Sequence, residues 1–140
     1  MIGPDKDGSL EICKTKAAEL NLPISFPGML QKEQWINLSK EYCIFINTTN
    51  SDNMPVSVME AMALGLPVIS TNVGVLPFLI ENEVDGVLIP PNNPEAFVKG
   101  IEDLCENPKK VQKITTKARF KMETFDWEKV KHSWIALLDN

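Results

Sequence analysis

The sequence predicts an α/β domain in which helices cover both faces of a doubly wound parallel sheet. Short runs of uniformly apolar residues alternate with helical patterns along most of the chain. Strands that are apolar on both sides are typical of parallel sheets whose two faces are buried. The chain has 140 residues, of which 44% are hydrophobic, and this is enough to form one core.

Four short apolar runs are predicted to be strands: residues 24–26, 43–47, 67–70 and 86–89. Helical patterns are found at residues 9–20, 31–40, 55–64 and 94–105. In the first of these helices, apolar side chains recur at a spacing of three to four residues, with charged residues between them. The chain after the last strand is expected to form three helices, the final one at residues 126–138.

The start of the chain leaves almost no room for a first strand, because Met1 and Ile2 are followed at once by a Gly3-Pro4 turn. We therefore expect the front half of a strand–turn–helix unit to lie outside this chain, as part of something longer. No internal repeat or low-complexity linker is found, so residues 1–140 are predicted to form one domain.

The net charge is −5, which argues against nucleic acid as a partner. The N-terminus lacks the features of a signal peptide, and no apolar stretch is long enough to span a membrane. Three widely spaced cysteines fit no metal-binding pattern, and we expect free thiols in a reducing, cytoplasmic environment. The lone His132 is expected to lie on the surface or to pack in the final helix.

Glu60 is the only ionisable residue between Asp52 and Glu81, and it lies in a helical pattern of apolar and small residues. Burying an unpaired carboxylate costs several kcal/mol, roughly, so a partner is expected. Either a basic residue distant in sequence reaches Glu60, or the hydroxyl groups of a ligand do.

The loop before this helix follows a predicted strand, and ligands of parallel sheets bind at the carboxyl ends of strands. Pro55 is predicted at the first helical position, so that the amides of Val56, Ser57 and Val58 remain unpaired donors that suit a phosphate. Asp52 precedes the helix, and Glu60 lies further along it. This order of carboxylate, amides and carboxylate suits a nucleotide-sugar. A helix cap or an Asx turn is the alternative role for Asp52.

The run DNMPVSVMEAMALGLPVISTNVG resembles the donor-binding segment of retaining glycosyltransferases of the GT-B fold, the large group-4 family. The two acidic residues of the family's E-x7-E motif fall on Asp52 and Glu60. The segments IGPDKDG, FPGMLQKEQW and VDGVLIPPNNPEAF resemble other family segments, so the likeness covers essentially the whole chain.

The resemblance implies that this chain is the C-terminal, Rossmann-like half of a two-domain enzyme. That half would bind the nucleotide-diphosphate sugar as substrate, without a metal or another cofactor, in polysaccharide or glycoconjugate synthesis. The N-terminal acceptor domain would be absent, together with the basic residues that neutralise the diphosphate. The chain alone is therefore expected to be inactive, and any peripheral membrane association would come through the absent domain.

Residue by residue, the resemblance assigns Asp52 to hydroxyls of the transferred sugar and Glu60 to the ribose, as the catalytic pair. The Val56 and Ser57 amides would hold the diphosphate. Gly28 and Met29 would lie beside the base, with a plain turn as the alternative for Gly28. The donor-binding segment also includes Asn53, Met54 and Pro55. The sequence departs from the family in having Asp for Glu at Asp52, Pro55 where Gly is common, Val75 after Gly74, and Phe78 where an acidic residue is common.

Two other functional hypotheses remain open from the sequence. The chain could be one subunit of a split glycosyltransferase, or a non-catalytic α/β interaction module that has lost its ligand. The aromatic residues near the C-terminus are expected to pack in the core, with exposure toward a missing domain as the alternative; they are Phe120, Phe125, Trp127 and Trp134.

Overall fold

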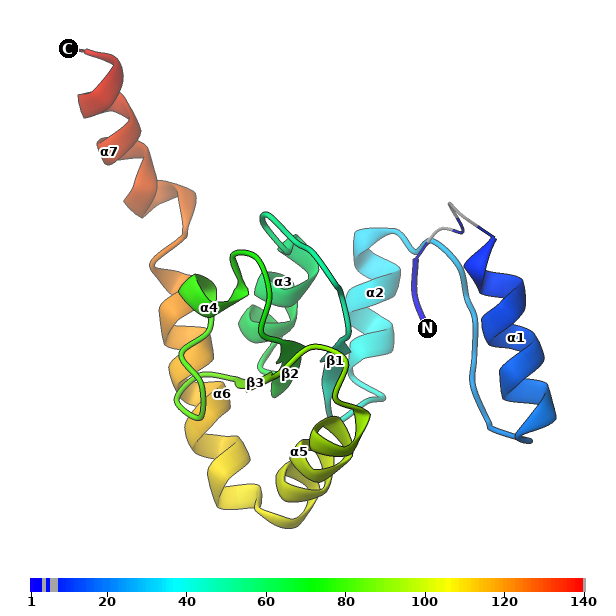
Figure 1. Cartoon of the computed structure of the whole chain (residues 1–140). Coiled ribbons are helices and arrows are strands. Elements are labelled where there is room, and N and C mark those ends of the chain that lie inside the picture. Colours follow the sequence, from blue (N-terminus) through cyan, green and yellow to red (C-terminus); the bar gives the residue numbers. More distant parts are fainter. Residues whose placement is uncertain (4, 6–7, 140) are drawn as a thin grey trace. The chain divides into compact units, whose positions relative to one another are not determined.

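The computed structural model describes residues 1–3, 5 and 8–139. The chain divides into two compact units, Met1–Glu41 and Tyr42–Asn140, and each is described by itself. The elements of both units are labelled in Figure 1. The prediction that residues 1–140 form a single nucleotide-sugar domain stays a prediction.

The N-terminal unit contains helices α1 (Ser9–Glu19) and α2 (Lys32–Ser39), both of which the sequence predicts to within a residue or two. A capping box at Gln31 starts α2, and in it the Gln31 N–H donates to Gln34 Oε1 at 2.9 Å. Pro4 of the predicted turn lies outside the described residues.

The strand predicted at residues 24–26 is wrong, because no ladder forms there in the described residues. One isolated parallel bridge joins Ile2 to Gly28, and the Gly3 N–H donates to the Gly28 carbonyl at 3.0 Å. The Met1 amino group also donates to the Ser25 carbonyl at 2.6 Å. A strand needs a neighbouring strand for its hydrogen bonds, and the residues before Gly3 provide only this short contact.

The C-terminal unit is built on a three-stranded parallel sheet in the order β1-β2-β3. The strands are β1 (Phe45–Asn47), β2 (Val68–Thr71) and β3 (Val87–Ile89). Ile46 pairs with Ile69, which pairs in turn with Val87, so one register runs across the sheet. The other three predicted strands are therefore confirmed, and so is the parallel α/β fold class.

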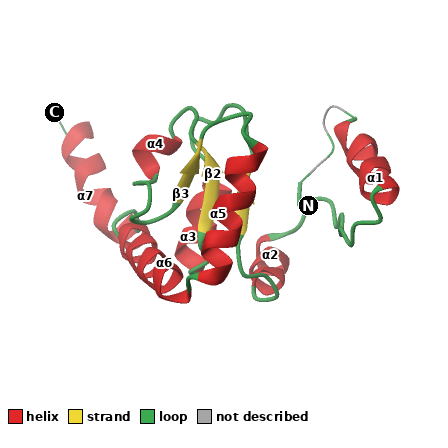
Figure 2. Ribbon diagram, turned by 60° about the horizontal axis from the view of Figure 1, so that its bottom comes forward, coloured by secondary structure: helices red, strands yellow, loops and turns green. Residues whose placement is uncertain are grey.

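Five helices complete this unit: α3 (Val56–Leu64), α4 (Leu76–Leu79), α5 (Pro94–Glu106), α6 (Pro108–Glu123) and α7 (Trp127–Leu138). Helix α3 contacts β1 and β2, and α5 contacts β2 and β3. Figures 1 and 2 show α3 and α5 on opposite sides of the strands. The three helices predicted after the last strand are confirmed, whereas the four-residue α4 is too short for a periodic pattern and was not predicted.

The core on the α5 side of the sheet consists of buried side chains from β2, β3, α5 and α6, namely Ile69, Val87, Ile89, Leu104 and Ile114. Gly100 lets α5 approach the sheet closely, because a Cβ there would lie 2.6 Å from Ile69 Cδ1. Helix α3 buries Val58, Ala61 and Met62. Packing of these side chains holds α3 against β1 and β2, and this places the first residues of α3 at the carboxyl ends of the strands.

A buried ion pair ties α6 to the turn before β3. The Asp85 side chain is only 4% exposed; its Oδ1 accepts from the Glu81 N–H at 2.8 Å, and its Oδ2 pairs with Lys121 Nζ. Lys121 Nζ also donates to the Leu79 carbonyl at 3.0 Å. Lys121 therefore binds one acceptor at each end of the segment from Leu79 to Asp85 and links this segment to α6.

A second set of charges joins α6 to α5 and to the same turn. Lys110 Nζ lies 2.6 Å from Asp103 Oδ2 and also pairs with Glu83. The hydrogen bond from Lys110 is the main reason that the pKa of Asp103 lies below its usual value, and it outweighs desolvation. Burial pulls the pKa of Lys110 down, but the hydrogen bonds and charges of Asp103 and Glu83 outweigh it, so that pKa is raised.

We expect the Lys110→Met substitution to raise the pKa of Asp103 toward its ordinary value, because the lowering comes mainly from the Lys110 hydrogen bond. The lowered pKa stabilises the fold above the ordinary aspartate pKa, and this contribution is lost as the pH falls through the folded-state value. A carbon-detected NMR titration of the Asp103 carboxyl measures the shift directly. Lys113→Met, an exposed change on the same helix, is the control, and equal titration curves for both variants would contradict the assignment.

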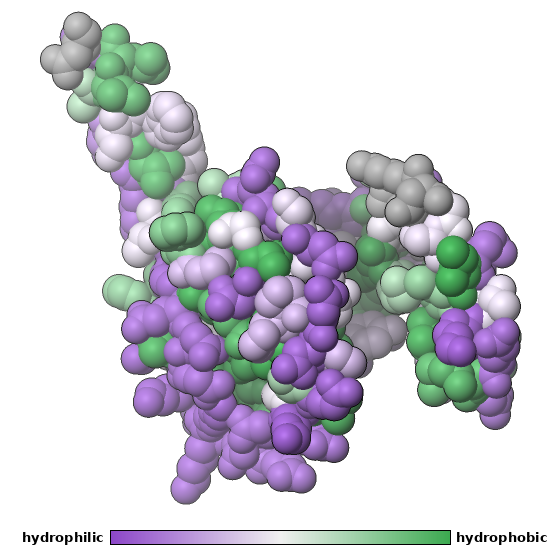
Figure 3. All heavy atoms as spheres, in the orientation of Figure 1, coloured by the Kyte–Doolittle hydropathy of each residue, from purple (hydrophilic) through white to green (hydrophobic). Residues whose placement is uncertain are grey.

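Helix α7 has no buried residue, which contradicts the expected core packing of the C-terminal aromatic residues. Phe120, Phe125, Trp127 and Trp134 are all exposed. Figure 3 shows apolar side chains gathered toward the C-terminal end of α7, where Ile135, Leu137 and Leu138 are exposed. Exposure is the alternative that the sequence left open. No helix among the described residues is both long enough and apolar enough to cross a membrane.

Candidate functional site

Two loops meet at the carboxyl ends of β1 and β2. Residues 48–55 connect β1 to α3, and residues 72–75 connect β2 to α4. The Val75 N–H donates to the Asp52 carbonyl at 3.2 Å, and Thr71 Oγ1 donates to the Thr49 carbonyl at 2.5 Å. The geometry therefore brings the predicted donor loop and the glycine-containing loop together, at the edge of the sheet where ligands of parallel sheets bind.

Asp52 lies half-buried in the first of these loops. Its Oδ1 accepts a hydrogen bond from the Met54 N–H at 3.2 Å, which makes an Asx turn. This is one of the alternatives that the sequence left open. The turn uses one carboxylate oxygen, and Oδ2 has no hydrogen bond in the part of the chain that the structure describes. The turn therefore orients the carboxylate and is compatible with a ligand at Oδ2.

The start of α3 differs from the prediction. Pro55 is the N-cap residue and not the first helical residue; its φ of −76° and ψ of 83° make an inverse γ-turn in which the Val56 N–H donates to the Met54 carbonyl at 2.9 Å. The Val58 N–H also has a partner, the Pro55 carbonyl at 2.9 Å. The prediction that the Val56 and Val58 amides are unpaired donors is therefore wrong. Among the described residues, the Ser57 amide has no acceptor and stays available at the positive end of the helix.

Glu60 lies on α3, one turn beyond Val56, and is half-buried. Two of the buried residues of this helix, Val58 and Met62, lie on the face opposite Glu60, and Ala61 is buried as well. Glu60 is thus not enclosed in the core, although the apolar sequence around it suggested so. Val56 and Leu64, its neighbours on the outer face, are themselves exposed.

Three buried or half-buried polar side chains support this edge of the sheet, and sequence reasoning missed them. Asn47 Nδ2 donates to Ser70 Oγ at 3.0 Å, across the ends of β1 and β2. Ser70 and Thr71 are buried, at 0% and 4% exposure. Polar residues at the end of the apolar run VIST were the available signal, because buried hydroxyls require partners.

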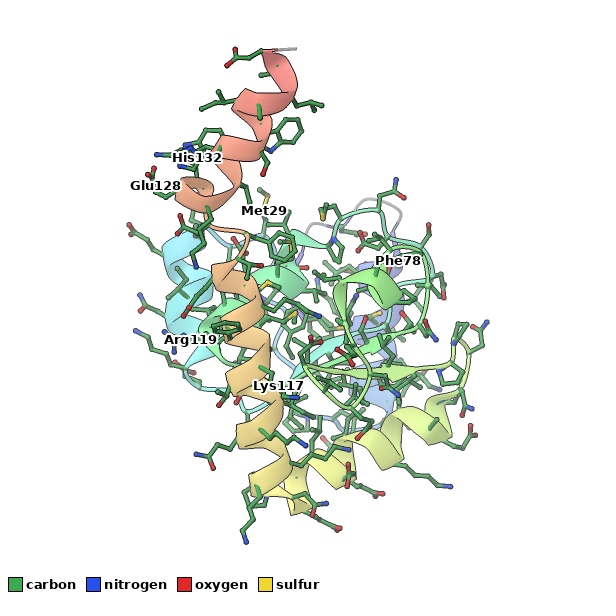
Figure 4. All side chains as sticks on the ribbon, turned by 90° about the vertical axis from the view of Figure 1, so that its left-hand side faces the viewer. Met29, Phe78, Lys117, Arg119, Glu128 and His132 are labelled. Atoms are coloured by element: carbon green, nitrogen blue, oxygen red, sulfur yellow. The ribbon has the colours of Figure 1, made fainter. Side chains whose placement is uncertain are left out.

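The remaining predicted residues fall in two places. Asn53 and Met54 are exposed in the same loop as Asp52. Gly28, with a φ of 73°, and the exposed Met29 belong to the N-terminal unit, so their part in a shared site stays a prediction. Figure 4 shows Phe78 on α4 and His132 on α7. Both are exposed, and the expected surface position of His132 is confirmed.

The fold and these loops define an open parallel α/β domain whose polar groups gather at the carboxyl ends of its strands. The chain belongs to the family of glycosyl transferases group 1, whose model matches residues 1–121. The family suggested by the sequence motifs is therefore confirmed.

Relatives in the same family are longer than this chain. An uncharacterized glycosyltransferase of Haemophilus influenzae is 33% identical over 125 residues, which cover 88% of this chain and 35% of that protein. The amylovoran biosynthesis glycosyltransferase AmsK of Erwinia amylovora is 32% identical over 124 residues, which cover 84% of this chain and 28% of that protein. The chain thus spans about a third of the length of these relatives.

Solved structures share the fold at lower sequence identity. Sucrose-phosphate synthase from Thermosynechococcus elongatus superposes with a TM-score of 0.87 at 24% identity, over 99% of this chain and 37% of that one. Anabaena HepE in complex with UDP-glucose gives a TM-score of 0.87 at 20% identity, over 99% of this chain and 39% of that one. These likenesses confirm the α/β fold.

Proposed function

We propose that this chain is the donor-binding domain of a retaining glycosyltransferase that acts in polysaccharide or glycoconjugate synthesis. The observation that carries the proposal is the segment from Asp52 to Glu60, which presents a carboxylate, an available helix N-terminal amide and a second carboxylate at the carboxyl edge of the sheet. Family membership supports it, as do the structures of HepE with UDP and UDP-glucose.

Each group in the segment has a role in the proposal. The ribose hydroxyls of the donor would donate to Glu60, and the Ser57 amide would donate to the diphosphate with the helix dipole behind it. Hydroxyls of the transferred sugar would donate to Asp52 Oδ2. The exposed Asn53 and Met54 would line the approach, and Gly28 and Met29 would contact the base.

The chemistry proposed at this site needs no protein nucleophile. The bond between the sugar C1 and the diphosphate oxygen breaks, and the acceptor oxygen bonds to C1 from the same face, so that configuration is retained. The leaving diphosphate takes the acceptor's proton. The protein positions the sugar and stabilises charge on the leaving group, without a metal.

The rest of the enzyme is also part of the proposal. An N-terminal acceptor domain would supply the acceptor site and the basic groups for the diphosphate, and any membrane association would come through it. In this proposal the protein is cytoplasmic.

The test is an amide NMR titration of the full chain with UDP, GDP and ADP. We expect saturable shifts at Ser57 and Glu60 for one of these nucleotides. In Glu60→Ala the affinity should fall by about tenfold or more, because hydrogen bonds to a charged group contribute roughly 1.5–3 kcal/mol. The nucleotide that binds identifies the base.

The control is Glu102→Ala, which removes an exposed carboxylate from α5. This variant should bind as the unchanged chain does. The proposal would be contradicted if no nucleotide caused saturable shifts at millimolar concentration, or if Glu60→Ala and Glu102→Ala bound equally well.

A further inference from the structure

The loop that follows β2 makes direct contacts with the backbone of the donor loop. The Val75 N–H donates to the Asp52 carbonyl at 3.2 Å. Three residues earlier in the donor loop, the Thr49 carbonyl accepts from the hydroxyl of Thr71 at 2.5 Å. Thr71 is buried at the end of β2, so the sheet itself anchors this contact.

Gly74 lies against the same peptide. Its φ is +56°, and a Cβ at this position would lie 2.2 Å from the Asp52 oxygen, 3.1 Å from its nitrogen and 3.2 Å from its carbonyl carbon. All three are backbone atoms, which cannot move aside as the end of a flexible side chain can. Any residue other than glycine at position 74 therefore displaces the Asp52 peptide.

The direction of the Asp52 carboxylate depends on that peptide. Its Oδ1 is held by the Met54 N–H two residues later, so the side chain turns with its own backbone. Glu60 and Ser57 lie on α3, which is fixed by packing of its buried face. A change at Gly74 should thus disturb the first carboxylate of the site and leave the second in place.

We propose that Gly74 and Thr71 are positioning residues for Asp52, and that they set how strongly the site holds the sugar of the donor over the nucleotide alone. This inference rests on the proposed function, in which Asp52 binds the transferred sugar. Residues that touch only the nucleotide determine the affinity for the nucleoside diphosphate. Asp52 would account for the additional affinity of the nucleotide-sugar over the nucleoside diphosphate.

The experiment compares the affinities of UDP and UDP-glucose, and of GDP and GDP-mannose, for the full chain by amide NMR titration. In Gly74→Ala we expect the affinity for the nucleotide-sugar to fall by about tenfold, the effect of one lost hydrogen bond to a charged group, while the affinity for the nucleotide stays the same. The matched control is Gly65→Ala, because Gly65 also has a positive φ, +83°, but a Cβ there meets nothing within 4 Å.

Thr71→Val provides a second test in case Gly74→Ala does not fold. It removes the hydroxyl that donates to Thr49, and should lower only the affinity for the nucleotide-sugar; Thr71→Ser, which keeps a hydroxyl, should restore it. The inference is overturned if the variant tested, Gly74→Ala or, where that does not fold, Thr71→Val, binds nucleotide-sugar as Gly65→Ala does. If the unchanged chain binds no nucleotide, or holds nucleotide and nucleotide-sugar equally, the proposed role of the donor segment fails first and this inference with it.

Discussion

Replacing Lys121 by Met is expected to destabilise the C-terminal unit by about 3 kcal/mol, because it leaves a buried carboxylate without its counter-ion. The Asp85 side chain is 4% exposed and, among the residues that the structure describes, would keep only the Glu81 N–H as a partner. The Leu79 carbonyl would lose its donor as well. We place the effect at the lower end of the range for buried pairs, since Lys121 itself is 31% exposed. Urea unfolding followed by amide NMR signals of β2 measures the change.

Two variants separate this ion pair from a general effect of removing charge. Lys117→Met removes an exposed lysine from the same helix, shown in Figure 4, and should change stability by less than about 0.5 kcal/mol. Adding Asp85→Asn to Lys121→Met should recover part of the loss, because the buried group is then neutral. Equal unfolding midpoints for Lys117→Met and Lys121→Met would show that the pair contributes nothing.

Replacing Ile69 by Ala is expected to cost about 3–4 kcal/mol of unfolding free energy, through lost burial and the cavity that remains. Ile69 is 0% exposed at the centre of β2 and belongs to the core cluster with Val87 and Leu104. The same NMR-detected urea unfolding applies. Because β2 carries Ser70 and Thr71 into the site, the loss should also loosen the loops at its carboxyl end.

The matched control is Ile46→Ala, since Ile46 is directly paired with Ile69 in the sheet but is 49% exposed. It should cost at most about 1 kcal/mol, the span of strand propensities. Ile69→Val should cost about 1 kcal/mol, because it removes a single methylene. A loss for Ile46→Ala as large as that for Ile69→Ala would contradict the packing of this core.

The sequence predicts most of this fold because its helices and inner strands carry their own periodic patterns. Prediction from the sequence fails where an element depends on contacts with another part of the chain. Residues 24–26 are apolar enough for a strand, but they form no ladder in the described part of the chain. The Ile2–Gly28 bridge lies beside them, and the Met1 amino group donates to the Ser25 carbonyl. Aromatic side chains such as Trp127 and Trp134 suggested core packing. Their exposure became apparent only in the structure, in which α7 has no buried residue.

The sequence indicates which residues belong to the candidate site, but it does not indicate most of their hydrogen bonds. Asp52 and Glu60 follow from spacing and chemistry. The occupied amide of Val56 depends on the γ-turn at Pro55, where the ψ value of 83° decides which donor is left. The contact of Gly74 with Asp52 joins loops from two strands, and no pattern within either loop shows it.

The exposed α7 decides what tryptophan fluorescence can report about this protein. Of the three tryptophans, Trp127 and Trp134 lie on α7, at 64% and 56% exposure, and Trp35 lies in α2 of the N-terminal unit. None of them lies in a strand of the sheet or in α3 or α5, which contact the strands. Emission therefore reports on α2 and α7, and a flat melting curve by fluorescence does not by itself show that β1, β2 and β3 remain folded.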